Sequence, residues 1–302
     1  MSVLLVVRHV EEGPGLLRWG LRAASALDLP LEVVCCQAGD SDELTWRREG
    51  DEPPAFLRDS KVRWGVVPVG NALTEVVEHV MSAGVKYVFT GKRNSGQELK
   101  GSPERRLSQA LFQHVPCAII VMRFPEGGEP REDRILVPAA GGPHSRTALQ
   151  LAHKLVGLAA TAFFVEPYAD EISREVGERQ LRKVVRDAGI DPGEIGCEVA
   201  LGEKVSDEIR NEAGSGHYGL VLIGASDLRS LRSRIFGTVT GRLLNGPAGI
   251  GVGVVRSAFP ARDRWRGQLG RILRLSVPQL EREERIALVD EVEGKARWTF
   301  DF

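Results

Sequence analysis

A long internal repeat divides the 302-residue sequence into two related halves. A shift of 133 residues places Gly91 on Gly224, Val121 on Val254 and Arg123 on Arg256. Within each half, short apolar runs alternate with segments of helical periodicity. A repeat this long indicates two duplicated domains and excludes a solenoid of small units. Strands that are apolar throughout and alternate with helices predict parallel sheets covered by helices on both faces.

Each half is expected to contain five strands in the same order. The expected strands are residues 3–7, 31–36, 62–69, 85–90 and 117–122, and then 134–137, 160–165, 198–201, 218–223 and 250–255. The expected helices cover residues 16–27, 73–80, 107–111, 147–158, 169–188, 205–213 and 234–244. Residues 124–133 are rich in proline and glycine and suit a linker, and residues 39–60 are expected to form an irregular loop.

The loop between Gly224 and Thr238 is the candidate ligand site. Gly224 ends an apolar strand, and Gly237 and Thr238 stand where a helix begins. Glycines let backbone N–H groups approach a phosphate, and the positive end of a helix dipole favours an anion. A purely structural loop, or a site for another anion, is the alternative interpretation.

The composition of the chain excludes several classes of function. The formal net charge is -1, so no global field favours nucleic acid. The four cysteines form no C-x-x-C pair, which fits a reducing cytosol, and Cys35 and Cys36 are expected to be buried apolar residues. His144 and His153 do not have metal-ligand spacing and are expected at the surface or at a helix cap. No Ser-His-Asp order or paired carboxylates stand out, so we expect no enzyme.

Two stretches carry a resemblance to a known family. The sequence RILVPAAGGPHS, residues 134–145, and the sequence HVPCAIIVMR, residues 114–123, resemble the opening and closing segments of universal stress proteins. The resemblance covers about residues 1–256. It implies an α/β protein with two Rossmann-like, five-stranded parallel-sheet domains, residues 1–125 and 132–257, paired within the chain as a pseudo-dimer. A helical segment, residues 258–302, follows. The implied role is a cytoplasmic sensor or regulator in the stress response.

The resemblance also implies a nucleotide site in the second domain only. Gly224, Gly237 and Thr238 match the G-x-x-G-x9-G-[ST] motif of the ATP-binding branch, but Asp227 replaces its second glycine. Ala140 stands where that branch has an aspartate. ATP or AMP would contact Pro138, Ala139, Ala140, Val165, Gly224, Ser226, Gly237, Thr238 and Val239. In the first domain, Glu104 occupies the corresponding helix start, so we expect no nucleotide there.

Residues 258–302, here called the C-terminal segment, lie outside the repeat. Arginines alternate there with apolar residues and with Trp265. This segment is similar to the lead-in of a bacterial membrane-protein family of unknown function. Either it packs on the second domain, or it lies at a membrane surface and the chain is the cytosolic part of a longer protein. The alternative functions are therefore a ligand-free cytosolic regulatory domain of a membrane protein or transporter and, less favoured, a slow ATP hydrolase. Association of two chains through another face stays open.

Overall fold

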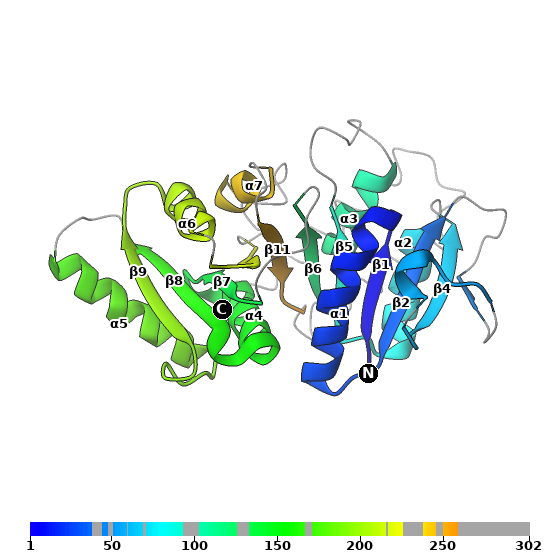
Figure 1. Ribbon diagram of the computed structural model, residues 1–302, viewed down its shortest axis with the longest axis horizontal. Coiled ribbons are helices and arrows are strands. Elements are labelled where there is room, and N and C mark those ends of the chain that lie inside the picture. The colour runs from blue at the N-terminus through cyan, green and yellow to red at the C-terminus, as the bar shows by residue number, and fades with distance from the viewer. Residues whose placement is uncertain are drawn as a thin grey trace, which may run out of the picture. The chain divides into compact units, whose positions relative to one another are not determined.

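The strands of the protein form one continuous sheet. The computed structural model describes residues 1–37, 44–47, 51–58, 60–68, 71–92, 103–125, 133–166, 171–215, 217–225, 238–245 and 250–258. Residues 1–258 form one compact unit. Its sheet has the strand order β3-β4-β2-β1-β5-β6-β11-β10-β7-β8-β9 (Figure 1). The predictions for the C-terminal segment fall on residues 259–302, outside the described residues.

The first lobe consists of β1 to β6 with their helices. Its strands are β1 (Val3–Val7), β2 (Leu31–Gln37), β3 (Thr45–Trp46), β4 (Arg63–Pro68), β5 (Tyr87–Gly91) and β6 (Ala118–Arg123). Its helices are α1 (Gly13–Leu27), α2 (Ala72–Ala83) and α3 (Pro103–His114), with 3-10 turns at Val10–Glu12 and Ala55–Leu57. All of its described strand pairs are parallel except β3 with β4.

The second lobe consists of β7 to β11 with their helices. Its strands are β7 (Ile135–Pro138), β8 (Ala160–Glu166), β9 (Gly196–Leu201), β10 (Leu220–Gly224) and β11 (Gly251–Arg256). Its helices are α4 (Gly142–Val156), α5 (Glu171–Asp187), α6 (Val205–Gly214) and α7 (Thr238–Asn245), with a 3-10 turn at Gly157–Ala159. These strands pair in parallel, as the apolar runs predict.

The region between β2 and β4 contains regular structure that the sequence did not predict. Residues 39–60 were expected to be irregular, whereas they contain β3 and the turn at Ala55–Leu57. The first lobe therefore has a sixth, antiparallel strand beside β4. Trp46 explains why so short a strand forms, because the Arg63 guanidinium lies 4.1 Å from the centre of its ring. A cation stacked on an aromatic face adds attraction that strand propensity alone does not provide.

The two lobes join through the last strand of each, β6 and β11. β6 and β11 are antiparallel, and Val121 pairs with Val254, its own counterpart in the repeat. The predicted pseudo-dimer is therefore present in the sheet, with a pseudo-twofold relation between the lobes at this pair. Pairing these two strands removes two exposed apolar edges, which would otherwise invite association with other chains.

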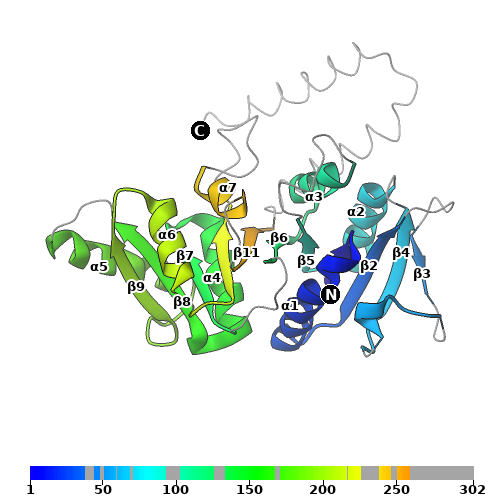
Figure 2. The same cartoon turned by 45° about the horizontal axis from the view of Figure 1, so that its top comes forward.

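Helices cover both faces of the sheet, and each face has its own core. The side chains of α1, α4 and α5 pack into one buried cluster, and those of α2, α3, α6 and α7 pack into another. Figure 2 shows α3 and α7 on one side of the sheet, and α1 and α4 on the other. This arrangement explains why the strands are apolar on both faces. Cys35 and Cys36 are buried, as predicted, and burial raises the pKa of the Cys36 thiol to about 12.

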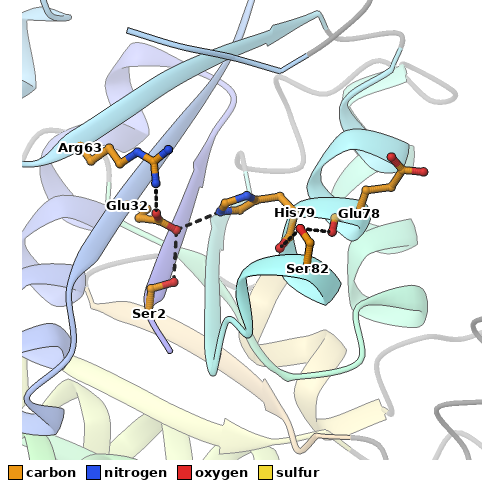
Figure 3. A network of polar contacts seen from close by, with 6 residues as sticks. All are labelled: Ser2, Glu32, Arg63, Glu78, His79 and Ser82. Carbon is orange, nitrogen blue, oxygen red and sulfur yellow. Dashed lines mark hydrogen bonds and ion pairs between the residues drawn. The ribbon is translucent and has the colours of Figure 1, made fainter. Parts of the chain in front are cut away.

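Glu32 is the charged residue of β2, and three side chains converge on it (Figure 3). The Ser2 hydroxyl donates to Glu32 Oε2 at 3.2 Å, and Arg63 Nη1 donates to Oε1 at 2.9 Å. His79 Nε2 lies 2.9 Å from Oε2. These partners stabilise the carboxylate form and lower the pKa of Glu32, the hydrogen bond from His79 contributing most.

Replacing Glu32 by glutamine is expected to lower the free energy of unfolding at pH 7 by about 1.5–3 kcal/mol, the size of a charge-assisted hydrogen bond. Because the folded-state pKa is lowered, this stabilisation is complete above the unfolded-state pKa of about 4.3 and is lost as the pH falls through the folded-state pKa. Urea unfolding at pH 7 and below pH 4 should therefore show a shrinking difference between wild type and Glu32→Gln. Glu52→Gln, in an exposed pair with Arg58, is the control. A constant difference at all pH values would contradict the assignment.

Candidate ligand-binding site

A cavity of about 380 Å³ opens at the carboxyl ends of β7, β8 and β10 in the second lobe. In the sheet, β8 and β9 lie on one side of β7, and β10 and β11 lie on the other. The order in which strands are added therefore reverses between β7 and β10. Open α/β sheets bind ligands in the crevice at such a switch point. We call this cavity the second-lobe pocket.

The second-lobe pocket is mainly apolar. Its described lining comprises Pro138, Ala139, Ala140, Gly141, Gly142, Pro143, His144, Ser145, Phe163, Phe164, Val165, Val205, Ile209, Ile223, Gly224, Ala225, Val239 and Thr240. None of these residues carries a carboxylate, an ammonium or a guanidinium group. A pocket of this composition favours a flat, uncharged ring over a free ion.

The N-terminus of α4 forms one polar wall of the pocket. Gly141 and Gly142 have φ values of 92° and 83°, which only glycine adopts without strain, so the chain turns sharply from β7 into α4. No side chain among the described residues caps the N-terminus of this helix, and its first turn contains no acidic residue. Ser145 in that turn is buried, and its hydroxyl has no hydrogen-bond partner among the described residues. A buried hydroxyl without a partner is costly, so this one is available for a ligand.

Gly224 fixes how closely α4 approaches β10. A Cβ atom at Gly224 would lie 2.5 Å from the backbone nitrogen of Ser145 and 2.7 Å from the carbonyl carbon of His144. The backbone of α4 therefore occupies the space that a side chain at Gly224 would need. This packing gives Gly224 a structural role that is independent of any phosphate.

Helices α6 and α7 form the opposite wall. Val205 and Ile209 from α6, and Val239 and Thr240 from the first turn of α7, line the pocket. The Arg242 guanidinium on α7 donates to the Ser206 hydroxyl on α6 at 3.3 Å, which links the two helices. The pocket is thus enclosed by helix N-termini on two sides.

Strand register identifies the counterpart of this site in the first lobe. Val3 pairs with Tyr87 in β5, and Ile135 pairs with Leu220 in β10. Tyr87 and Leu220 are counterparts in the repeat, so Val3 corresponds to Ile135. Five residues further along each strand, Arg8 corresponds to Ala140.

A buried ion pair occupies this position in the first lobe. Arg8 Nη2 lies 3.2 Å from Glu12 Oε1, and the two side chains are only 1% and 9% exposed. Arg8 also donates to the carbonyl oxygen of Gly91, the counterpart of Gly224. A Cβ atom at Gly91 would lie 2.3 Å from the Glu12 carboxyl carbon. The space beside Gly91 is therefore filled by the lobe's own side chain.

Comparison with solved structures identifies the fold. A candidate universal stress protein from Pseudomonas aeruginosa superposes with a TM-score of 0.53 and 14% identity, over 84% of this chain and 92% of that one. A universal stress protein from Archaeoglobus fulgidus gives 0.54 and 11%, over 83% and 97%. The chain has the universal stress protein fold.

The same fold occurs in a transporter domain. The cytoplasmic domain of a prokaryotic cation chloride cotransporter superposes with a TM-score of 0.55 and 11% identity, over 85% of this chain and 95% of that one. No family model matches the sequence, and no curated protein does. The universal stress protein fold is therefore recognised from three-dimensional structure and from the repeat, at low sequence identity.

Within this fold, the structure places most of the predicted site residues around one cavity. Six of them line the second-lobe pocket: Pro138, Ala139, Ala140, Val165, Gly224 and Val239. Thr238 is the first residue of α7, and its side chain lies outside the described part. Ser226 and Gly237, together with Asp227, also lie outside the described residues.

Other residues that line the pocket were not predicted from the sequence. Phe163 and Phe164 stand at the carboxyl end of β8, where position along the strand could have indicated them. Val205 and Ile209 were predicted only to lie in a helix, residues 205–213. His144 was expected at the surface or as a cap, whereas it is half-buried in the pocket wall, and its Nδ1 accepts the backbone N–H of Ser257 at 3.1 Å.

Two further classes of site find no support in the described ranges. No group of three or more histidine, cysteine, aspartate or glutamate side chains there could hold a metal ion. Of the helices described, none is long and apolar enough to cross a membrane.

Proposed function

We propose that the protein is a cytoplasmic regulatory module of the stress-protein type that binds one adenine nucleotide, ATP or AMP, in its second lobe. The observation that carries the proposal is the buried Ser145 hydroxyl, without a described partner, at an uncapped helix N-terminus in a largely apolar crevice. The apolar surface around Phe163 and Phe164 suits a purine ring. The hydroxyl and the backbone N–H groups suit oxygen atoms of a ribose or phosphate.

The proposal limits binding to a single site per chain. In the first lobe, the Arg8–Glu12 pair fills the space beside Gly91, and Glu104 lies in the first turn of α3. A negative side chain at that helix start competes with a phosphate. Binding would then act by changing the packing between lobes or the contact with a partner. No chemical step is assigned to a residue.

Titration with ATP and AMP is expected to show one site per chain and to raise the melting temperature. A ligand at 100 times its Kd stabilises the folded state by about 2.7 kcal/mol. Ala140→Trp, which places a ring in the mouth of the pocket at an exposed position, should weaken binding by at least about tenfold, or about 1.4 kcal/mol. Isothermal titration calorimetry and thermal shift measure both effects, with Leu158→Trp, at another exposed position, as the matched control. Two sites per chain, or equal binding by Ala140→Trp, would refute the proposed site.

A second function has its own support. The cotransporter domain with the same fold is cytoplasmic and belongs to a membrane transporter. The alternating arginines and apolar residues of the C-terminal segment suit an anionic lipid surface. In this alternative the two lobes are a ligand-free regulatory domain of a membrane protein. Absence of a thermal shift with every adenine nucleotide favours this second function over the first.

A further inference from the structure

Two buried arginines cross the junction between the lobes in opposite directions. Arg123, at the end of β6, donates from Nη2 to the carbonyl oxygen of Leu243 in α7 at 3.1 Å. Arg256, its counterpart at the end of β11, donates from Nη2 to the carbonyl oxygens of Val115 and Cys117 in the first lobe. Their exposed fractions are 3% and 0%. Burial lowers the pKa of Arg256 to about 10, so this group remains protonated at neutral pH.

Arg123 binds the helix whose other end lines the pocket. α7 has eight residues, Thr238–Asn245, and Leu243 lies in its last turn. The last carbonyl groups of a helix have no partner within the helix and carry the negative end of its dipole, so a guanidinium stabilises this end. Val239 and Thr240, in the first turn, line the second-lobe pocket.

A helix of two turns does not hold its position by itself. Isolated helices shorter than about 12 residues are marginal in water, so α7 depends on its tertiary contacts. Within its own lobe, these include the buried Leu243 and Leu244 and the Arg242–Ser206 hydrogen bond. The hydrogen bond from Arg123 comes from the first lobe and reaches α7 at the end away from the pocket.

We propose that Arg123 is a positioning residue for the second-lobe pocket, so that the first lobe, whose own site is filled, completes the ligand site of the second. The inference rests on the proposed nucleotide binding for its functional consequence. The first lobe holds α7 at the distance from α4 and β10 that the pocket requires. Loosening this contact lets the first turn of α7 move, and this movement weakens the binding of a ligand in the pocket.

Arg256 provides a matched control within the same chain. It has the same side chain, the same place in the repeat and the same kind of acceptor. Its acceptors in the first lobe, where Arg8 and Glu12 fill the site, lie between the end of α3 and the start of β6, and its Nη1 also donates to the carbonyl oxygen of the adjacent Ser257. Replacing Arg256 therefore disturbs the junction to a similar degree without releasing α7.

The test measures Kd for a fluorescent N-methylanthraniloyl derivative of ATP with the full chain, the variants Arg123→Met and Arg256→Met, and the conservative variant Arg123→Lys. Arg123→Met should weaken binding by at least about tenfold, and Arg256→Met by less than about twofold, at comparable loss of stability in urea. Arg123→Lys, which keeps one charged donor, should recover part of the affinity and decides the question if Arg123→Met does not fold. Equal losses in both methionine variants, or no loss in Arg123→Met, would overturn the proposal.

Hydrogen exchange separates this inference from the proposed function. If wild type does not bind the nucleotide, the proposed function fails, and the exchange of amides 240–244 tests the positioning role alone. Protection should fall in Arg123→Met and stay near the wild-type value in Arg256→Met, because only the first variant releases the end of α7. Equal protection of these amides in both variants means that Arg123 does not position α7.

Discussion

Glu12→Gln is expected to lower the free energy of unfolding by about 3–5 kcal/mol, because the substitution removes one partner of a buried ion pair. The Arg8 side chain is 1% exposed, and its charge would lose the carboxylate that lies 3.2 Å away. Water cannot replace that carboxylate at so buried a position. Urea unfolding of wild type and variant at neutral pH measures the loss.

The exposed pair between Glu175 and Arg179 is the matched control. It has the same spacing of four residues, but its side chains are 66% and 76% exposed. Glu175→Gln should therefore change the free energy of unfolding by no more than about 0.5 kcal/mol. A similarly small change in Glu12→Gln would mean that the buried pair is not what fills and stabilises the first-lobe site. The double variant Arg8→Met/Glu12→Leu should recover most of the loss, because no isolated charge remains.

The architecture could be predicted because its signals are local and repeated. An apolar run such as residues 3–7 is compatible with a strand buried on both faces, and its counterpart at residues 134–137 repeats the signal. The pairing of β6 with β11 was implied by the family resemblance, and it covers two apolar edges. β3 was missed because it is short and is held by a contact with Arg63 from another strand.

The site was harder to predict because its walls come from separate elements. Ala140 and Gly224 were recognised from motif spacing, whereas Ser145 gains its meaning only when burial leaves its hydroxyl without a described partner. Nothing in the sequence pattern indicated that Arg8 would fill a site. Its pairing with Glu12 depends on how the chain folds after β1. The space beside Gly91 that this pair occupies cannot be predicted from residue spacing.

Gly224→Ala is expected to destabilise the protein by about 1–3 kcal/mol or more, the usual cost of forcing extra volume into a packed core. The added Cβ atom would lie 2.5 Å from the Ser145 nitrogen, and backbone in the first turn of a helix cannot move without moving the helix. The start of α4 would shift away from β10 and carry the Ser145 hydroxyl with it. We therefore expect weaker nucleotide binding together with the lower stability, measured by urea unfolding and by calorimetry.

Gly214→Ala shows whether the effect comes from close packing or from glycine flexibility. Gly214 is the last residue of α6, and no heavy atom lies within 4 Å of the Cβ position. Alanine there reduces only the freedom of the unfolded chain, so it should stabilise the protein by about 0.4–1 kcal/mol. Opposite signs for the two variants would show that Gly224 is required by the approach of α4. If both variants were neutral, the contact between β10 and α4 would be looser than the structure has it, and Ser145 would not be held at the pocket.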